Sequence, residues 1–147
     1  MAVEQVERWE PVAGVETPVA RAVTAENELG LCVTLKFSEI RDGHESDLRL
    51  VFGKVPAYVV HEEFVHPWPH EAAPTLKGEW DRFFYPLLIV KKSLWHASFS
   101  ESNLLNWPNC IHYRLLTLDQ IVDVLCNKSP TVEWIAADDD PDNTSTQ

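Results

Sequence analysis

The segment HEEFVHPWPHE, residues 61–71, holds the densest group of side chains that could do chemistry. His61, His66 and His70 lie there among glutamates, and imidazole with carboxylate is a ligand set of zinc and iron sites. A helical zinc motif needs two histidines four residues apart, whereas His61 and His66 are five apart and prolines follow. We therefore predict neither a metal nor a cofactor. If a metal does bind, His61, His66 and His70 are the candidate ligands.

The same segment holds a tryptophan in an unusual place. Trp68 lies between two prolines, where no regular element is expected to bury it. Tryptophan is enriched at the centres of protein interfaces. We therefore predict that Trp68, with His66 and His70 beside it, contacts a partner.

Other candidate catalytic groups lack a supporting motif. His96 and His112 could act as general bases, but the alternation of their neighbours predicts that both lie on exposed faces. The cysteines Cys32, Cys110 and Cys126 have no CxxC spacing and lie among apolar residues, so we expect reduced, inert thiols. No GxSxG, phosphate-binding or dinucleotide-binding motif occurs. We predict no catalytic residue, and a non-enzymatic role is favoured while catalysis stays open.

Composition narrows the class of protein. The chain has 147 residues, 45% of them hydrophobic, which suits one domain with its own core. The formal charge of −11 disfavours nucleic-acid binding, which depends on cationic contacts to phosphate. Apolar runs are too short to cross a membrane, and the charged N-terminus does not resemble a signal peptide. We therefore expect a cytoplasmic protein that binds neither nucleic acid nor membrane.

The elements that must position these side chains centre on FFYPLLIV, residues 83–90, which is the longest apolar run. It lacks alternation, so we expect both faces to be covered, with a strand starting after Pro86. Elsewhere, alternation and β-branched residues predict further short strands. The predicted strands span residues 31–37, 48–52, 57–61, 87–91, 111–116 and 131–136.

The segment TLDQIVDVLCNK is the strongest helix candidate. Thr117 and Gln120 have the spacing of a capping box. Apolar side chains then recur with helical spacing at Leu118, Ile121, Val122 and Leu125. We therefore predict a helix over residues 118–127, which could connect the strands on either side of it in parallel.

These elements sum to an α+β fold: a single, mainly antiparallel sheet of about five or six strands with one well-defined C-terminal helix, residues 118–127. We divide the chain into an extended N-terminal arm (1–30), one α+β domain (31–137) and a disordered acidic tail (138–147). The arm holds six glutamates against two arginines, and the tail holds four aspartates and no base. Most of the negative charge therefore lies outside the predicted domain.

Three stretches carry a resemblance: YPLLIVKKSLWHASF, HYRLLTLDQIVDVLC and VEWI. Over residues 83–136 the chain resembles a family of small bacterial proteins of uncharacterised function. In size and acidity it is also similar in class to the immunity proteins of bacterial toxin systems. The resemblance rests on structural residues and implies no catalytic group.

We predict a protein-binding domain, and immunity-like neutralisation of a partner protein is one version of that role. Two alternatives stay open. One is a small metal-dependent enzyme that uses the His61–Glu71 loop, and the other is a structural subunit that associates with itself, for example as a homodimer. The sequence does not identify the partner or the oligomeric state.

Overall fold

A computed structural model describes residues 3–15, 17–38, 47–62 and 68–136. The chain forms two antiparallel sheets, joined by loops and two single-turn helical segments. The strands are β1 Gln5–Arg8, β2 Val19–Asn27, β3 Gly30–Phe37, β4 Asp47–Gly53, β5 Ala57–Glu62, β6 Leu87–Lys91, β7 Ile111–Leu116, β8 Gln120–Cys126 and β9 Thr131–Ile135. The helical segments are η1 Gly78–Trp80 and α1 Leu94–Ala97.

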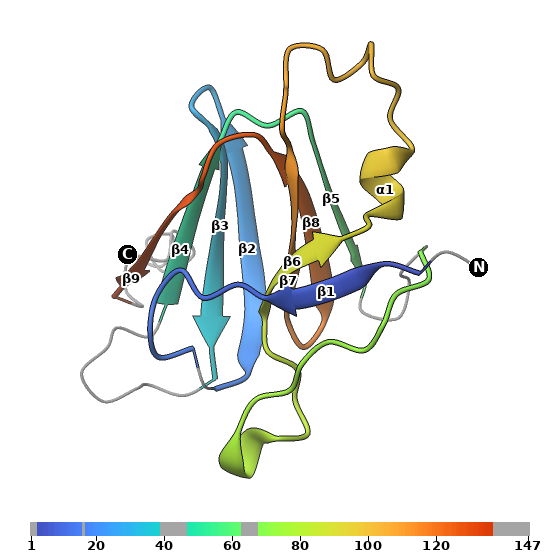
Figure 1. The fold of residues 1–147 in the computed structure, drawn as a ribbon. Helices are drawn as coiled ribbons and strands as arrows, with labels where there is room; N and C mark the ends of the chain where they lie inside the picture. Colours follow the sequence, from blue (N-terminus) through green and yellow to red (C-terminus); the bar gives the residue numbers. More distant parts are fainter. Residues whose placement is uncertain (1–2, 16, 39–46, 63–67, 137–147) are drawn as a thin grey trace.

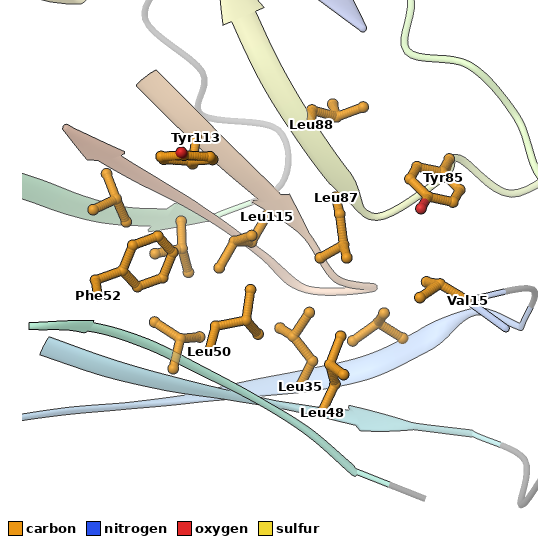
Figure 2. Packing of buried hydrophobic residues seen from close by; sticks show 14 of the residues in the cluster. Val15, Leu35, Leu48, Leu50, Phe52, Tyr85, Leu87, Leu88, Tyr113 and Leu115 are labelled. Atoms are coloured by element: carbon orange, nitrogen blue, oxygen red, sulfur yellow. The ribbon is translucent and has the colours of Figure 1, made fainter. Parts of the chain in front are cut away.

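The two sheets pack face to face as a β-sandwich (Figures 1 and 2). One has five strands in the order β1-β6-β7-β8-β5, and the other has four in the order β2-β3-β4-β9. Their inner faces meet in an apolar core (Figure 2), in which every side chain is at most 9% exposed. Leu35, Leu48 and Leu50 enter it from the four-stranded sheet, and Leu87 and Leu115 from the five-stranded sheet. Burial of this apolar area is the main stabilising contribution.

The predicted α+β fold with a single sheet is wrong, because the predicted helix over residues 118–127 is strand β8. β8 pairs antiparallel with β7 on one side and β5 on the other, so it lies inside the five-stranded sheet. Both of its faces are covered, and an apolar run buried on both faces carries no alternation to distinguish strand from helix. Its β-branched residues Ile121, Val122 and Val124 favour the strand.

The predicted capping box forms a hairpin turn instead. The Gln120 N–H donates to Thr117 Oγ1 at 2.9 Å, which is the local bond expected of a cap. However, the Thr117 N–H donates to the Gln120 backbone carbonyl at 3.0 Å. The flanking residues Leu116 and Ile121 then pair across the two strands. The chain therefore reverses over two residues, and the predicted parallel connection is an antiparallel β7–β8 hairpin.

Other elements agree with their sequence patterns. β6 occupies residues 87–91, directly after Pro86, and three of its five residues are buried. α1 begins after Ser93, whose Oγ accepts from the His96 N–H at 2.9 Å. The segment 1–30 was predicted as an extended arm outside the domain, and the structure places its residues 5–8 in one sheet as β1 and its residues 19–27 in the other as β2. The predicted tail at 138–147 lies outside the described residues. No helix of the described part is long and apolar enough to cross a membrane.

Candidate functional site

The outer face of the five-stranded sheet carries a cluster of buried and half-buried polar side chains, which we call the buried network. The register of the strands builds it, because Arg114 on β7 lies opposite Asp123 on β8. His112 lies two residues before Arg114 on the same face, and His61 on the neighbouring β5 lies opposite Ile121, two residues from Asp123. Its members are Glu4, His61, Ser93, His112, Arg114 and Asp123.

Asp123 is the centre of the buried network. It is 0% exposed, and its carboxylate contacts His112 Nε2 at 2.6 Å, Arg114 Nε at 2.7 Å and His61 Nε2 at 2.9 Å. Burial alone would raise the pKa of Asp123, but the hydrogen bonds from His112 and His61 and the charge of Arg114 hold it well below its ordinary value. Asp123 therefore stays ionised in the folded protein.

Glu4 connects the buried network to the start of α1. It is 0% exposed, and its Oε1 accepts from Arg114 Nη2 at 2.8 Å. Its Oε2 accepts from the backbone N–H groups of Leu94 at 2.8 Å and Trp95 at 3.4 Å. The carboxylate thus satisfies two N–H groups that the short helix leaves without partners.

Ser93, His112 and Asp123 form a serine–histidine–aspartate chain. Ser93 Oγ lies 2.6 Å from His112 Nδ1, while His112 Nε2 contacts Asp123. Acyl transfer also needs N–H donors to stabilise the oxyanion. At the start of α1, however, the N–H groups of Leu94 and Trp95 bond to Glu4, and that of His96 bonds to Ser93. The geometry therefore supports a structural role for these three hydrogen-bonded side chains.

The structure describes His61, Trp68 and His70 among the predicted site residues, and it brings Trp68 close to His61. Trp68 is half-buried, and its ring lies 5.7 Å from Trp95 and 6.2 Å from His61, so it covers the buried network. His70 is exposed and contacts the Glu71 carbonyl through Nδ1 at 3.0 Å. His66 lies outside the described residues. Among the residues that the structure describes, no group of three or more histidine, cysteine or acidic residues is placed to hold a metal.

Sequence reasoning missed most of the buried network. His112 was expected on an exposed face but is 2% exposed, and its Nε2 contacts Asp123. Glu4, Arg114 and Asp123 were not singled out. One signal was available, because Arg114 and Asp123 are opposite charges inside two apolar segments. A charge in such a segment needs a partner when it is buried.

All three cysteines are unpaired. Burial raises the pKa of each thiol above its ordinary value. For Cys126 a hydrogen bond with the Lys128 backbone and the charge of Lys128 oppose this rise without cancelling it. Low thiolate content makes these cysteines poor nucleophiles and metal ligands.

An apolar surface lies beside the buried network, and we call it the Phe84 groove. It consists of two adjoining cavities of about 210 and 250 Å³ that share Phe84, Leu116 and Thr117 as lining residues. The first is lined further by Val6, His70, Glu71, Ala72, Ala73, Leu88, Arg114 and Ile121, and the second by Pro18, Val19, Arg82, Phe83 and Leu118. Phe84 is 51% exposed and Leu118 is 47% exposed. The groove therefore offers large apolar side chains to solvent.

Ser93 lines a separate surface groove of about 530 Å³ between α1 and the following loop. This groove is lined also by His96, Phe99, Leu105, Trp107 and Cys110.

Comparison with protein-family models, with curated proteins and with solved structures found no match. The resemblance over residues 83–136 therefore remains a prediction, and function has to be argued from the site itself.

Proposed function

We propose that this domain acts by binding another protein, and that the partner contacts the Phe84 groove. The observation that supports this is the exposure of Phe84 and Leu118 on a groove that is already hollow and mostly apolar. Apolar patches of this kind, with an aromatic residue among them, are typical of protein interfaces. Leu29 is more exposed, at 80%, but it lies at the tip of the β2–β3 hairpin.

The charge of the chain favours a basic partner. A formal charge of −11 attracts a cationic protein, raises its association rate and repels acidic competitors. Immunity-like neutralisation of a basic protein is the version of the role that fits this charge. Three unpaired cysteines are consistent with a reducing compartment, and we place the protein in the cytoplasm.

The alternative roles have less support. A metal-dependent enzyme using the His61–Glu71 loop would need histidines that converge, whereas His61 contacts Asp123 and His70 lies on the surface. Self-association would use the same exposed apolar side chains, so a homodimer formed through the Phe84 groove is one outcome of the test below.

The test is native mass spectrometry of the protein purified under mild conditions from cells that make it, with metal analysis of the same sample. The wild type is compared with the Phe84→Ser, Leu118→Ser double variant and with Leu29→Ser as a matched exposed control. We expect a stoichiometric second protein with the wild type and the control, and its loss with the double variant. A second protein retained by the double variant, a homodimer without a second protein, or a zinc-loaded or iron-loaded monomer would overturn the proposal.

A further inference from the structure

Ala72 and Ala73 form a short segment with free backbone groups on the wall of the Phe84 groove. On one side, the Glu71 N–H donates to the Glu4 carbonyl at 3.0 Å, and on the other, the Tyr85 N–H donates to the Pro74 carbonyl at 2.7 Å. Within the described ranges, no hydrogen bond involves the backbone of Ala72 or Ala73. Figure 1 shows this part of the chain passing below β1.

These backbone groups belong to no helix or strand of the described chain, so they are not committed to another partner. In an extended chain, the N–H and C=O of one residue point to the same edge and can exchange two hydrogen bonds with an added strand. Ala72 is exposed and Ala73 half-buried, so an incoming chain can reach them. Peptide recognition by strand addition uses main-chain bonds for affinity and a neighbouring pocket for specificity.

The adjoining cavity has the size and polarity of an apolar anchor site. Its volume is about 210 Å³, whereas a dry apolar cavity of roughly 150 Å³ already holds benzene. Arg114 lines it, and Glu4 Oε1 and Asp123 Oδ1 bond to its Nη2 and Nε, whereas Nη1 has no partner among the described residues. Two carboxylates match the cation and Glu71 also lines the cavity, so the cavity offers no unbalanced positive charge to an acidic anchor. An uncharged side chain the size of phenylalanine or leucine fits best.

We infer that the Phe84 groove recognises an extended polypeptide segment, which pairs through its main chain with Ala72 or Ala73 and inserts one large apolar side chain into the 210 Å³ cavity. This inference rests on the proposed function and specifies the chemistry of its partner. Phe84 and Leu118 then pack against the flanking residues of the segment, at the side where the second cavity opens.

The test uses a blocked seven-residue peptide, Lys-Thr-Val-Phe-Val-Thr-Lys, titrated into the full chain labelled with nitrogen-15. One control peptide replaces phenylalanine with threonine and keeps the charge. A second carries N-methyl groups on the central amides and keeps the apolar side chains. We expect saturable shifts of the Ala72 and Ala73 amides with the first peptide, and binding at least about tenfold weaker with each control, the loss expected for one or two net hydrogen bonds or a buried ring.

The Ala73→Trp variant fills the cavity and should weaken binding of the phenylalanine peptide by a similar factor. Because the N-methylated peptide is tested on the wild type, the result does not depend on how this variant folds. Absence of saturable shifts, shifts confined to another surface, or equal binding of all three peptides would overturn the inference. These outcomes leave the proposed function standing if the natural partner still requires Phe84 and Leu118. Partner binding without those two residues would overturn both.

Discussion

Replacing Arg114 with methionine removes a buried cation that two buried carboxylates share. Arg114 donates from Nε to Asp123 at 2.7 Å and from Nη2 to Glu4 at 2.8 Å, and both carboxylates are 0% exposed. Methionine keeps much of the apolar volume, so the main effect is to leave two negative charges in the interior. Breaking a buried pair from one side costs about 3–5 kcal/mol. We expect a loss of stability of that size.

The measurement is urea unfolding at pH 7 and low temperature, followed by tryptophan fluorescence. With an m value of about 2 kcal/mol/M, the unfolding midpoint of Arg114→Met should fall by roughly 2 M. The matched control is Arg49→Met, because Arg49 faces Glu133 at 3.5 Å and their side chains are 37% and 53% exposed. Exposed pairs contribute about 0–1 kcal/mol, so the control should unfold near the wild-type midpoint.

Two results would refute this reasoning. If Arg114→Met lowered the free energy of unfolding by less than about 1 kcal/mol, burial of the two carboxylates would not require Arg114, contrary to what the distances indicate. If Glu4→Gln and Arg114→Met had strictly additive effects, Glu4 and Arg114 would not interact energetically, because contacting charges are expected to couple by more than about 0.5 kcal/mol.

Two further predictions concern the five-stranded sheet. Folding lowers the pKa of Asp123, so the unfolded chain binds the proton more readily than the folded protein. The stability that Asp123 contributes should therefore be complete above about pH 5 and should fall as the pH drops below about 4. Urea unfolding between pH 7 and pH 2 should show this slope, and Asp123→Asn should flatten it; equal slopes would contradict it. Thr117→Ala removes the acceptor of the Gln120 N–H and should cost about 1 kcal/mol in the same assay, whereas Thr117→Ser should restore most of it.

Alternation of apolar and polar residues predicted several strands from the sequence. The alternation arises because one face of each strand packs on the apolar core and the other face does not. The predicted strands at 31–37 and 111–116 correspond to β3 and β7, and β6 begins directly after Pro86. Pro86 cannot donate a ladder hydrogen bond, so its effect is local and independent of the rest of the fold. The bond between Thr117 and Gln120 is local too, and it forms although the element after it was predicted wrongly.

The candidate site could not be predicted in the same way. Glu4 and Arg114 lie 110 residues apart, and Glu4 reaches the site only because β1 pairs with β6. The exposure of Phe84 and the free backbone of Ala72 likewise depend on which segments pass nearby, and no local pattern encodes that. No regular element was expected to bury Trp68 between its prolines, but it packs against Trp95 from another element.

The sequence by itself determined where apolar segments begin and end, because turn residues and proline act within a few residues of themselves. Tertiary structure decided that residues 120–126 form a strand. The β-branched Ile121, Val122 and Val124 favour a strand, but a mostly apolar run also fits a buried helix, and pairing with β5 and β7 selects the strand. The same pairing sets Asp123 opposite Arg114, and this contact makes the burial of both charges tolerable.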